Sequence, residues 1–143
     1  MKAQLKILSA VSLILLAVIV FVACDSGVSA AGKWQDAAYR KDAEFGEGAK
    51  TVVVKVVVEE QTVSFTLHTD KTYLGDALLE HELIEGDDGE FGIYIKKVNG
   101  ILADYDVDKT YWGFYKNGEM MMTGVSFAEI SDGEQYELVL EGA

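Results

Sequence analysis

Apolar and polar residues alternate through "TVVVKVVVEEQTVSFTLHT", and this pattern predicts a β-hairpin. Val63, Phe65 and Leu67 are separated by polar residues, which is the two-residue period of a half-buried strand. With Glu60-Gln61 as the turn, the preceding strand places a second apolar row on the same face, formed by Val54, Val56 and Val58. A slip of one residue would bury Lys55, so the pattern fixes which face of the hairpin is buried.

The period changes in the next segment, "TYLGDALLEHELIEGDDG". Leu74, Ala77, Leu78 and His81 follow the i, i+3, i+4, i+7 spacing of one helix face. The spacing predicts a helix, with Thr72 as its N-cap and Gly86 as its C-terminal stop. His81 is expected to be a partly exposed helix residue rather than a metal ligand.

The remaining segments return to strand patterns. Asn99-Gly100 and Asn117-Gly118 each predict a hairpin turn, because both residue types tolerate positive φ. The last segment, "SDGEQYELVLE", places Tyr136, Leu138 and Leu140 on one face of a final strand. Several strands and one helix predict an α+β fold, a mixed or antiparallel sheet with one packed helix.

The N-terminal residues have the order of a secretory signal peptide. Lys2 and Lys6 precede an uncharged run that ends in "FVAC". These four residues resemble a bacterial lipobox, whose cysteine is lipidated and becomes the new N-terminus. We therefore expect residues 1–23 to be removed and Cys24 to anchor the chain to the outer side of a cell membrane. A retained transmembrane helix and an unmodified cysteine are the alternatives.

Residues 24–50 are predicted to connect this anchor to a globular domain at 51–143. The stretch "DSGVSAAG" is small and polar, as is typical of a flexible tether. Trp34, Tyr39 and Phe45 follow it, and aromatic residues in a connector indicate that its second half packs on the domain.

The charge balance and the absence of catalytic motifs exclude several functions. The chain has a net charge of −12, and removal of the two N-terminal lysines leaves 10 basic and 24 acidic residues, 10 − 24 = −14. Nucleic acid is not an expected partner, because phosphate binding needs clustered Lys and Arg. No dinucleotide fingerprint, P-loop, HExxH motif or nucleophile elbow occurs. With its one cysteine lipidated, the chain is not expected to be an enzyme.

The hairpin around Asn117-Gly118 carries the candidate binding residues. Side chains alternate between two faces, and one face carries Trp112, Phe114, Lys116, Glu119 and Met121. Because this face bears the charged pair, it is predicted to face solvent and to expose Trp112, Phe114 and Met121 as a binding surface. The alternative is that a neighbouring strand or the Trp34 segment covers it.

From Thr51 onward the chain resembles the domain that closes transcobalamin and intrinsic factor, which also occurs alone in bacterial surface lipoproteins as a DUF4430-like family. The matching stretches are "TYLGDALLEHELI", "GIYIKKVNG", "ADYDVDKTYWGFY" and "TGVSFAEISDGEQYELVL". The resemblance implies a β-grasp-like sheet and a strand that lies against a corrin ring, with Trp112, Gly113 and Phe114 as corrinoid contacts. The carriers hold cobalamin between this domain and a large helical domain that this sequence lacks. The expectation is therefore weak affinity, a second protein that completes the site, or a different ligand.

An acidic segment, "ADYDVDKTYW", offers a rival site. Asp104, Asp106 and Asp108 alternate as ligands do at the start of a calcium loop. Lys109 and Tyr115 stand where an EF-hand needs glycine and glutamate. The three aspartates are thus either a calcium-type site or part of a solvated turn. The function classes left open are capture of a small molecule, an adhesive module that binds glycan or protein, and cation binding.

Overall fold

The computed structural model describes residues 32–142, and one compact unit begins at Lys33. The predictions for the signal peptide and for Cys24 lie outside the described residues. Among the residues that are described, no helix is long and apolar enough to cross a membrane.

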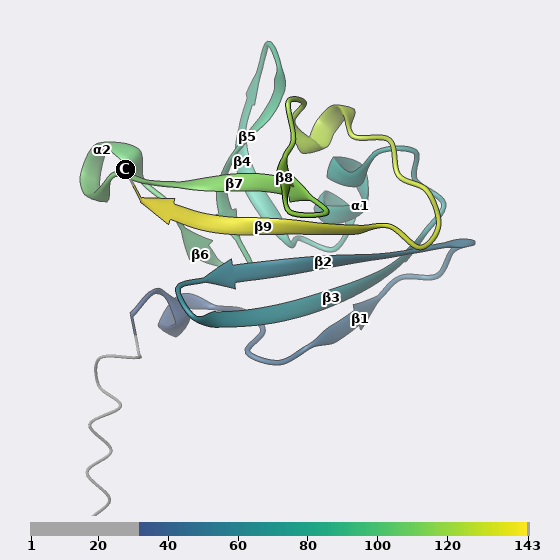
Figure 1. Ribbon diagram of the computed structural model, residues 1–143, viewed down its shortest axis with the longest axis horizontal. Coiled ribbons are helices and arrows are strands. Elements are labelled where there is room, and N and C mark those ends of the chain that lie inside the picture. Colours follow the sequence, from purple (N-terminus) through teal and green to yellow (C-terminus); the bar gives the residue numbers. More distant parts are fainter. Residues whose placement is uncertain (1–31, 143) are drawn as a thin grey trace, which may run out of the picture. The chain divides into compact units, whose positions relative to one another are not determined.

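Six strands form a mixed sheet in the order β1-β3-β2-β9-β7-β8 (Figure 1). Their bounds are β1 Ala43–Phe45, β2 Lys50–Val58, β3 Gln61–Thr69, β7 Thr110–Lys116, β8 Glu119–Met120 and β9 Gln135–Gly142. β1 runs parallel to β3 and β2 runs parallel to β9, whereas the other neighbours are antiparallel.

A second, three-stranded antiparallel sheet and a helix pack against one face of the large sheet (Figure 1). The second sheet comprises β4 Ile84–Gly89, β5 Gly92–Val98 and β6 Ile101–Leu102, and the helix is α1 Leu74–Glu80. Three short helical segments complete the described chain: η2 Lys33–Asp36, α2 Tyr105–Asp108 and η3 Val125–Phe127. The predicted α+β class with one packed helix is confirmed.

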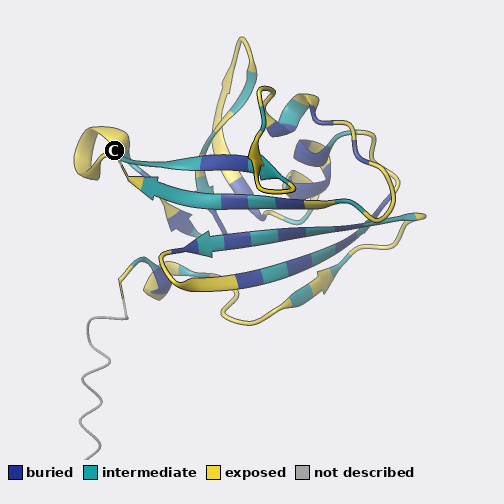
Figure 2. Cartoon of the chain, viewed as in Figure 1, coloured by how far each residue is buried: buried dark blue, intermediate teal, exposed yellow. Residues whose placement is uncertain are grey.

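The core lies between the large sheet and these covering elements. Buried and half-buried residues alternate along β2, β3 and β9 (Figure 2). The core row of the large sheet is Val52, Val54, Val56, Val58, Val63, Phe65, Leu67, Phe114, Tyr136 and Leu138. Leu74, Ala77 and Leu78 cover this row from α1.

The first hairpin turns one residue earlier than predicted. Val58 pairs with Gln61 and Val56 with Val63, so the turn is Glu59-Glu60 and not Glu60-Gln61. Glu59 adopts a φ of 55° there. Each residue of β2 therefore pairs with a residue of β3 that lies two positions earlier than the predicted turn implies. The apolar face is unchanged, because side chains alternate with a period of two. The Asn99-Gly100 and Asn117-Gly118 hairpins are confirmed, each with positive φ at both turn residues.

The helix is shorter than its pattern predicts at both ends. Tyr73 stands at the N-cap without a side-chain hydrogen bond, so Thr72 is not the cap. The helix ends before Glu82, whose φ of 54° is incompatible with its continuation. Ile84 already belongs to β4, which places the predicted stop Gly86 within a strand, next to a β-bulge.

Residues 33–45 are part of the folded unit. The buried Trp34 donates from Nε1 to the carbonyl oxygen of Val58 at 3.2 Å. Asn99, which is 1% exposed, binds the backbone of Tyr39 twice: its side-chain oxygen accepts from the amide at 2.8 Å, and its Nδ2 donates to the carbonyl at 2.7 Å. The lead-in segment is thereby tied to the β5–β6 turn and to the end of β2.

Candidate ligand-binding site

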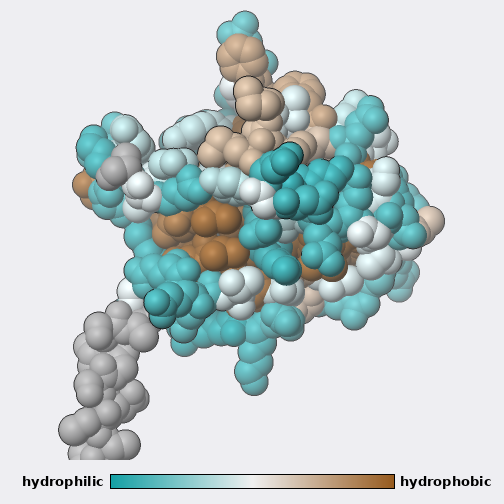
Figure 3. Space-filling model, viewed as in Figure 1, coloured by the Kyte–Doolittle hydropathy of each residue, from teal (hydrophilic) through white to brown (hydrophobic). Residues whose placement is uncertain are grey.

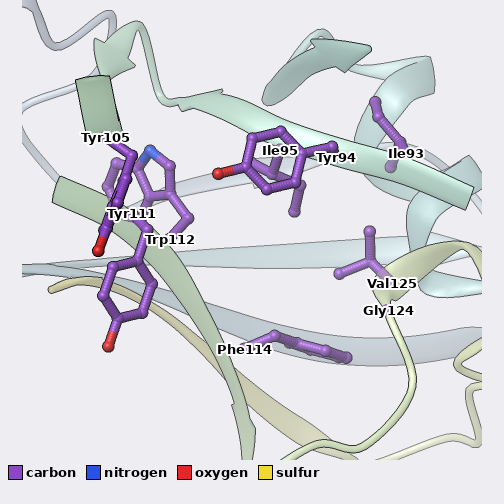
Figure 4. A pocket seen from close by; sticks show the side chains of 9 residues that line it. All are labelled: Ile93, Tyr94, Ile95, Tyr105, Tyr111, Trp112, Phe114, Gly124 and Val125. Atoms are coloured by element: carbon purple, nitrogen blue, oxygen red, sulfur yellow. The ribbon is translucent and has the colours of Figure 1, made fainter. Parts of the chain in front are cut away.

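An open pocket of about 460 Å³ lies where β5 of the second sheet faces β7 of the large sheet (Figure 4). Its size falls in the range of small-molecule sites, and its lining is mainly apolar. The lining residues are Ile93, Tyr94, Ile95, Tyr105, Tyr111, Trp112, Phe114, Gly124 and Val125.

The floor of the pocket is formed by Phe114 and Trp112. Phe114 is 9% exposed and stacks on Tyr136, with ring centroids 5.7 Å apart. Trp112 is partly buried and packs against the same core. Both side chains lie on the core face of β7, so the prediction that this face looks into open solvent is wrong.

Lys116 explains why that prediction fails. It shares the face of Phe114 but lies at the end of β7, where its Nζ pairs with Glu134 at 2.6 Å and sits 5.5 Å from the centroid of the Tyr136 ring. A lysine at the edge of a core can lay its apolar stem on the core and keep its ammonium group paired. A charged residue at a strand end therefore does not identify the solvent face.

Three tyrosines surround the mouth of the pocket. Tyr94 on β5 is 58% exposed and Tyr105 on α2 is 48% exposed. Tyr111 is the second residue of β7, and its hydroxyl is hydrogen-bonded to Glu141. Figure 4 shows Tyr105 and Tyr111 beside Trp112 at one end of the pocket, with Val125 at the other end. The site thus combines an apolar aromatic floor with phenol groups that can donate or accept hydrogen bonds at the rim.

The indole of Trp112 carries a buried donor without a partner. Its Nε1 forms no hydrogen bond to any described residue. An unpaired buried donor costs about 1–3 kcal/mol of stability. Trp112 forms part of the pocket floor, and an unpaired buried donor in a native fold calls for a structural or functional reason.

Two of the predicted contacts do not line the pocket. Gly113 points to the opposite face of the sheet, where a Cβ atom would lie 2.8 Å from Cε2 of Tyr115 and 3.1 Å from Cδ of Glu141. The lack of a side chain lets the Tyr115 ring cross Gly113 so that its hydroxyl donates to Glu141. This hydrogen bond, aided by desolvation, raises the pKa of Tyr115 to about 12. Met121 packs at the core edge, and its amide donates to the Phe114 carbonyl at 2.9 Å.

Lys116, Glu134 and Tyr136 form a hydrogen-bonded network beneath the pocket floor. Burial alone would raise the pKa of Glu134, but the side chains of Lys116 and Tyr136 and the amide of Ser131 hydrogen-bond to its carboxylate and lower the pKa overall. Burial and the bond to Glu134 raise the pKa of Tyr136. Both groups stay in one protonation state near neutral pH and support the floor without titrating.

The three aspartates do not form the predicted calcium site. Asp104 caps α2, and its Oδ1 accepts from the amides of Asp106 at 3.0 Å and Val107 at 3.3 Å. Asp108 pairs with Lys33 Nζ at 2.5 Å and also accepts from Thr110. The hydrogen bonds from Lys33 and Thr110 lower the pKa of Asp108 to about 2. Within residues 32–142, no three His, Cys, Asp or Glu side chains are grouped so that they could hold a metal ion.

These features define a single α+β domain with an apolar, aromatic pocket between its two sheets. The chain belongs to the family described as "Domain of unknown function (DUF4430)", whose model matches residues 71–140. The family prediction is thereby confirmed. A comparison with curated protein sequences gives no match.

Two solved structures share this fold. The chain is 32% identical to a protein from Ruminococcus gnavus ATCC 29149, provisionally described as metal binding, with a TM-score of 0.63 over 66% of this chain and 99% of that one. It is 21% identical to haptocorrin in complex with Cbi, with a TM-score of 0.50 over 68% of this chain. The second match spans 26% of the haptocorrin chain, and at this identity it shows the fold alone.

Proposed function

We propose that the chain is a membrane-anchored extracellular module that captures a small molecule, with a corrinoid as the first candidate, in the pocket over Trp112 and Phe114. The observation that carries the proposal is the open pocket of about 460 Å³ with its aromatic floor. The fold shared with haptocorrin, whose structure is a complex with Cbi, supports the choice of ligand class.

The lining suits a flat ligand with a polar periphery. Trp112 and Phe114 offer apolar ring surface to the face of such a ligand, and burial contributes about 25 cal/mol per Å² of apolar area. Tyr94 and Tyr105 border the pocket, and their hydroxyls are available for the peripheral amide groups of a corrinoid. An open pocket covers one side of the ligand, so we expect a dissociation constant of about 1–100 μM.

Attachment to the membrane and binding without catalysis are parts of the same proposal. Lipidation of Cys24 would hold the module at the outer surface, and we assign capture to the pocket without any catalytic step. Labelling of cells with an alkyne fatty acid tests the anchor. Label on the wild-type chain that is lost in Cys24→Ala supports it, and equal labelling of both contradicts it.

We do not extend the provisional description of the R. gnavus protein as metal binding to this site. Asp104 accepts two amide hydrogen bonds as the N-cap of α2, and Asp108 is in an ion pair with Lys33. We therefore propose no resident metal at Asp104, Asp106 and Asp108.

Tryptophan fluorescence tests the proposal, because the chain has two tryptophans and only one lies in the pocket. Trp34→Phe leaves Trp112 as the reporter, and cobalamin should quench its emission in a saturable way. Trp112→Phe leaves Trp34, whose signal measures light absorption by cobalamin itself. Identical loss of signal in both variants, or no saturation at about 1 mM, would remove the corrinoid as ligand.

A further inference from the structure

Three large apolar side chains form an exposed platform beside the pocket. Phe91 is 82% exposed at the tip of the β4–β5 hairpin, and Met122 and Phe127 are 97% and 56% exposed in the segment that follows β8. Figure 3 shows apolar side chains on the projecting hairpin and on the segment next to it. Contiguous exposed apolar groups of this kind mark interaction sites on soluble proteins.

The platform is held together by direct contacts between its two segments. The amide of Ile93 donates to Oγ of Ser126 at 3.0 Å. A Cβ atom at Gly92 would lie 2.5 Å from Cβ of Ser126 and 3.3 Å from Cε2 of Phe127, so glycine is what permits this approach. Gly92 also has a φ of +88°, which other residues rarely adopt. The platform is therefore preformed by the fold.

Its shape favours a protein over a small molecule as the occupant. Small-molecule sites are concave, whereas these side chains project from the surface at more than half exposure. Protein interfaces are anchored by Phe and Met side chains that enter hollows of the partner. η2, where the described chain begins, lies on the opposite side of the domain in Figure 1, so the start of the domain leaves the platform open.

Charge narrows the choice of partner. Residues 84–98 carry four carboxylates, Glu85, Asp87, Asp88 and Glu90, against two lysines, a net charge of 2 − 4 = −2. The whole chain carries −12, so a second copy and an anionic lipid surface are both repelled. A surface with Lys and Arg around an apolar patch is attracted instead.

We propose that the platform of Phe91, Met122 and Phe127 docks a second protein, whose apolar contact surface is bordered by basic side chains. This inference does not depend on the identity of the pocket's ligand. Tyr94, Gly124 and Val125 belong to the two platform segments and also line the pocket, so a docked partner would border its mouth.

Site-specific photo-cross-linking in cells that produce the full chain tests the proposal. The photoreactive residue p-benzoylphenylalanine replaces Phe91 in one variant and Val107 in a control variant, because Val107 is 80% exposed on α2, away from the platform segments. We expect a discrete protein adduct from position 91 that position 107 does not give. The adduct should disappear when Asp88→Lys and Glu90→Lys reverse the hairpin charge. The purified partner should bind the full chain at least about tenfold more weakly after Phe91→Ser.

Several results would overturn the inference. These are no protein adduct from position 91, the same adducts from both positions, an adduct of the chain with itself or with lipid, and an adduct that survives charge reversal. Phe91→Ser and the charge variants change exposed residues, so an unchanged melting temperature will show that each variant is folded.

Discussion

Replacement of Asn99 by alanine should lower the free energy of unfolding by about 3 kcal/mol. Asn99 is buried, makes two side-chain hydrogen bonds to the backbone of Tyr39, and adopts a φ of 52°. Each lost hydrogen bond contributes about 1 kcal/mol. Alanine in the left-handed region adds about 1 kcal/mol, since asparagine tolerates this region better than alanine does.

Asn99→Gly separates the two effects. Glycine adopts positive φ without strain, so this variant should lose the hydrogen bonds alone, about 2 kcal/mol. Urea unfolding followed by far-UV circular dichroism gives both values. Tryptophan fluorescence, to which the buried Trp34 contributes, is read in the same samples and reports in part on the lead-in segment.

The wild-type chain should show one transition by both probes, because Trp34 and Asn99 tie the lead-in segment to the domain. If Asn99→Ala lowers the free energy of unfolding by less than about 1 kcal/mol, the two side-chain hydrogen bonds of Asn99 do not stabilise the fold as proposed. Equal losses in the alanine and glycine variants would refute the contribution of the left-handed backbone.

Three further predictions concern charges near the site. The pKa of Asp108 is lowered from 3.8 to about 2, so its pairing with Lys33 should stabilise the fold above pH 3.8 and be lost as the pH falls through about 2. A carboxyl NMR titration should show a midpoint near 2 that rises toward 3.8 in Lys33→Met. Gly113→Ala should push the Tyr115 ring from Glu141 and return the Tyr115 pKa from about 12 toward 10, as measured by ultraviolet absorbance, with ligand binding unchanged. Calcium at about 1 mM should give no binding heat with the domain, since a weak extracellular-type site would already respond there; a saturable heat would contradict the assignment of the aspartates.

Local sequence patterns predicted much of the fold because they report local geometry. The two Asn-Gly turns require positive φ, and both occur where the residue types indicate. The alternation of β2 and β3 identified the core face even though the turn was misplaced by one residue. The pairing of β1 with β3, and of β2 with β9, joins segments far apart in the chain, and no local pattern encodes such a partner.

The candidate site was predicted only in part, for a related reason. Trp112 and Phe114 were identified from β7 itself, whereas Ile93, Ile95 and Tyr105 enter the pocket from β5 and α2. Their contribution depends on how the second sheet packs on the first. Gly113 was read as a ligand contact, but its neighbours Tyr115 and Glu141 give it a packing role that appears only in three dimensions.

The indole NMR signals of the two tryptophans test the central proposal most directly. In a ¹⁵N-labelled chain titrated with cobalamin, the Nε1–H signal of Trp112 should shift in a saturable way, while that of Trp34, bonded to the Val58 carbonyl, should stay in place. Movement of neither signal at about 1 mM cobalamin, or equal movement of both, would contradict capture of a corrinoid in the Trp112–Phe114 pocket.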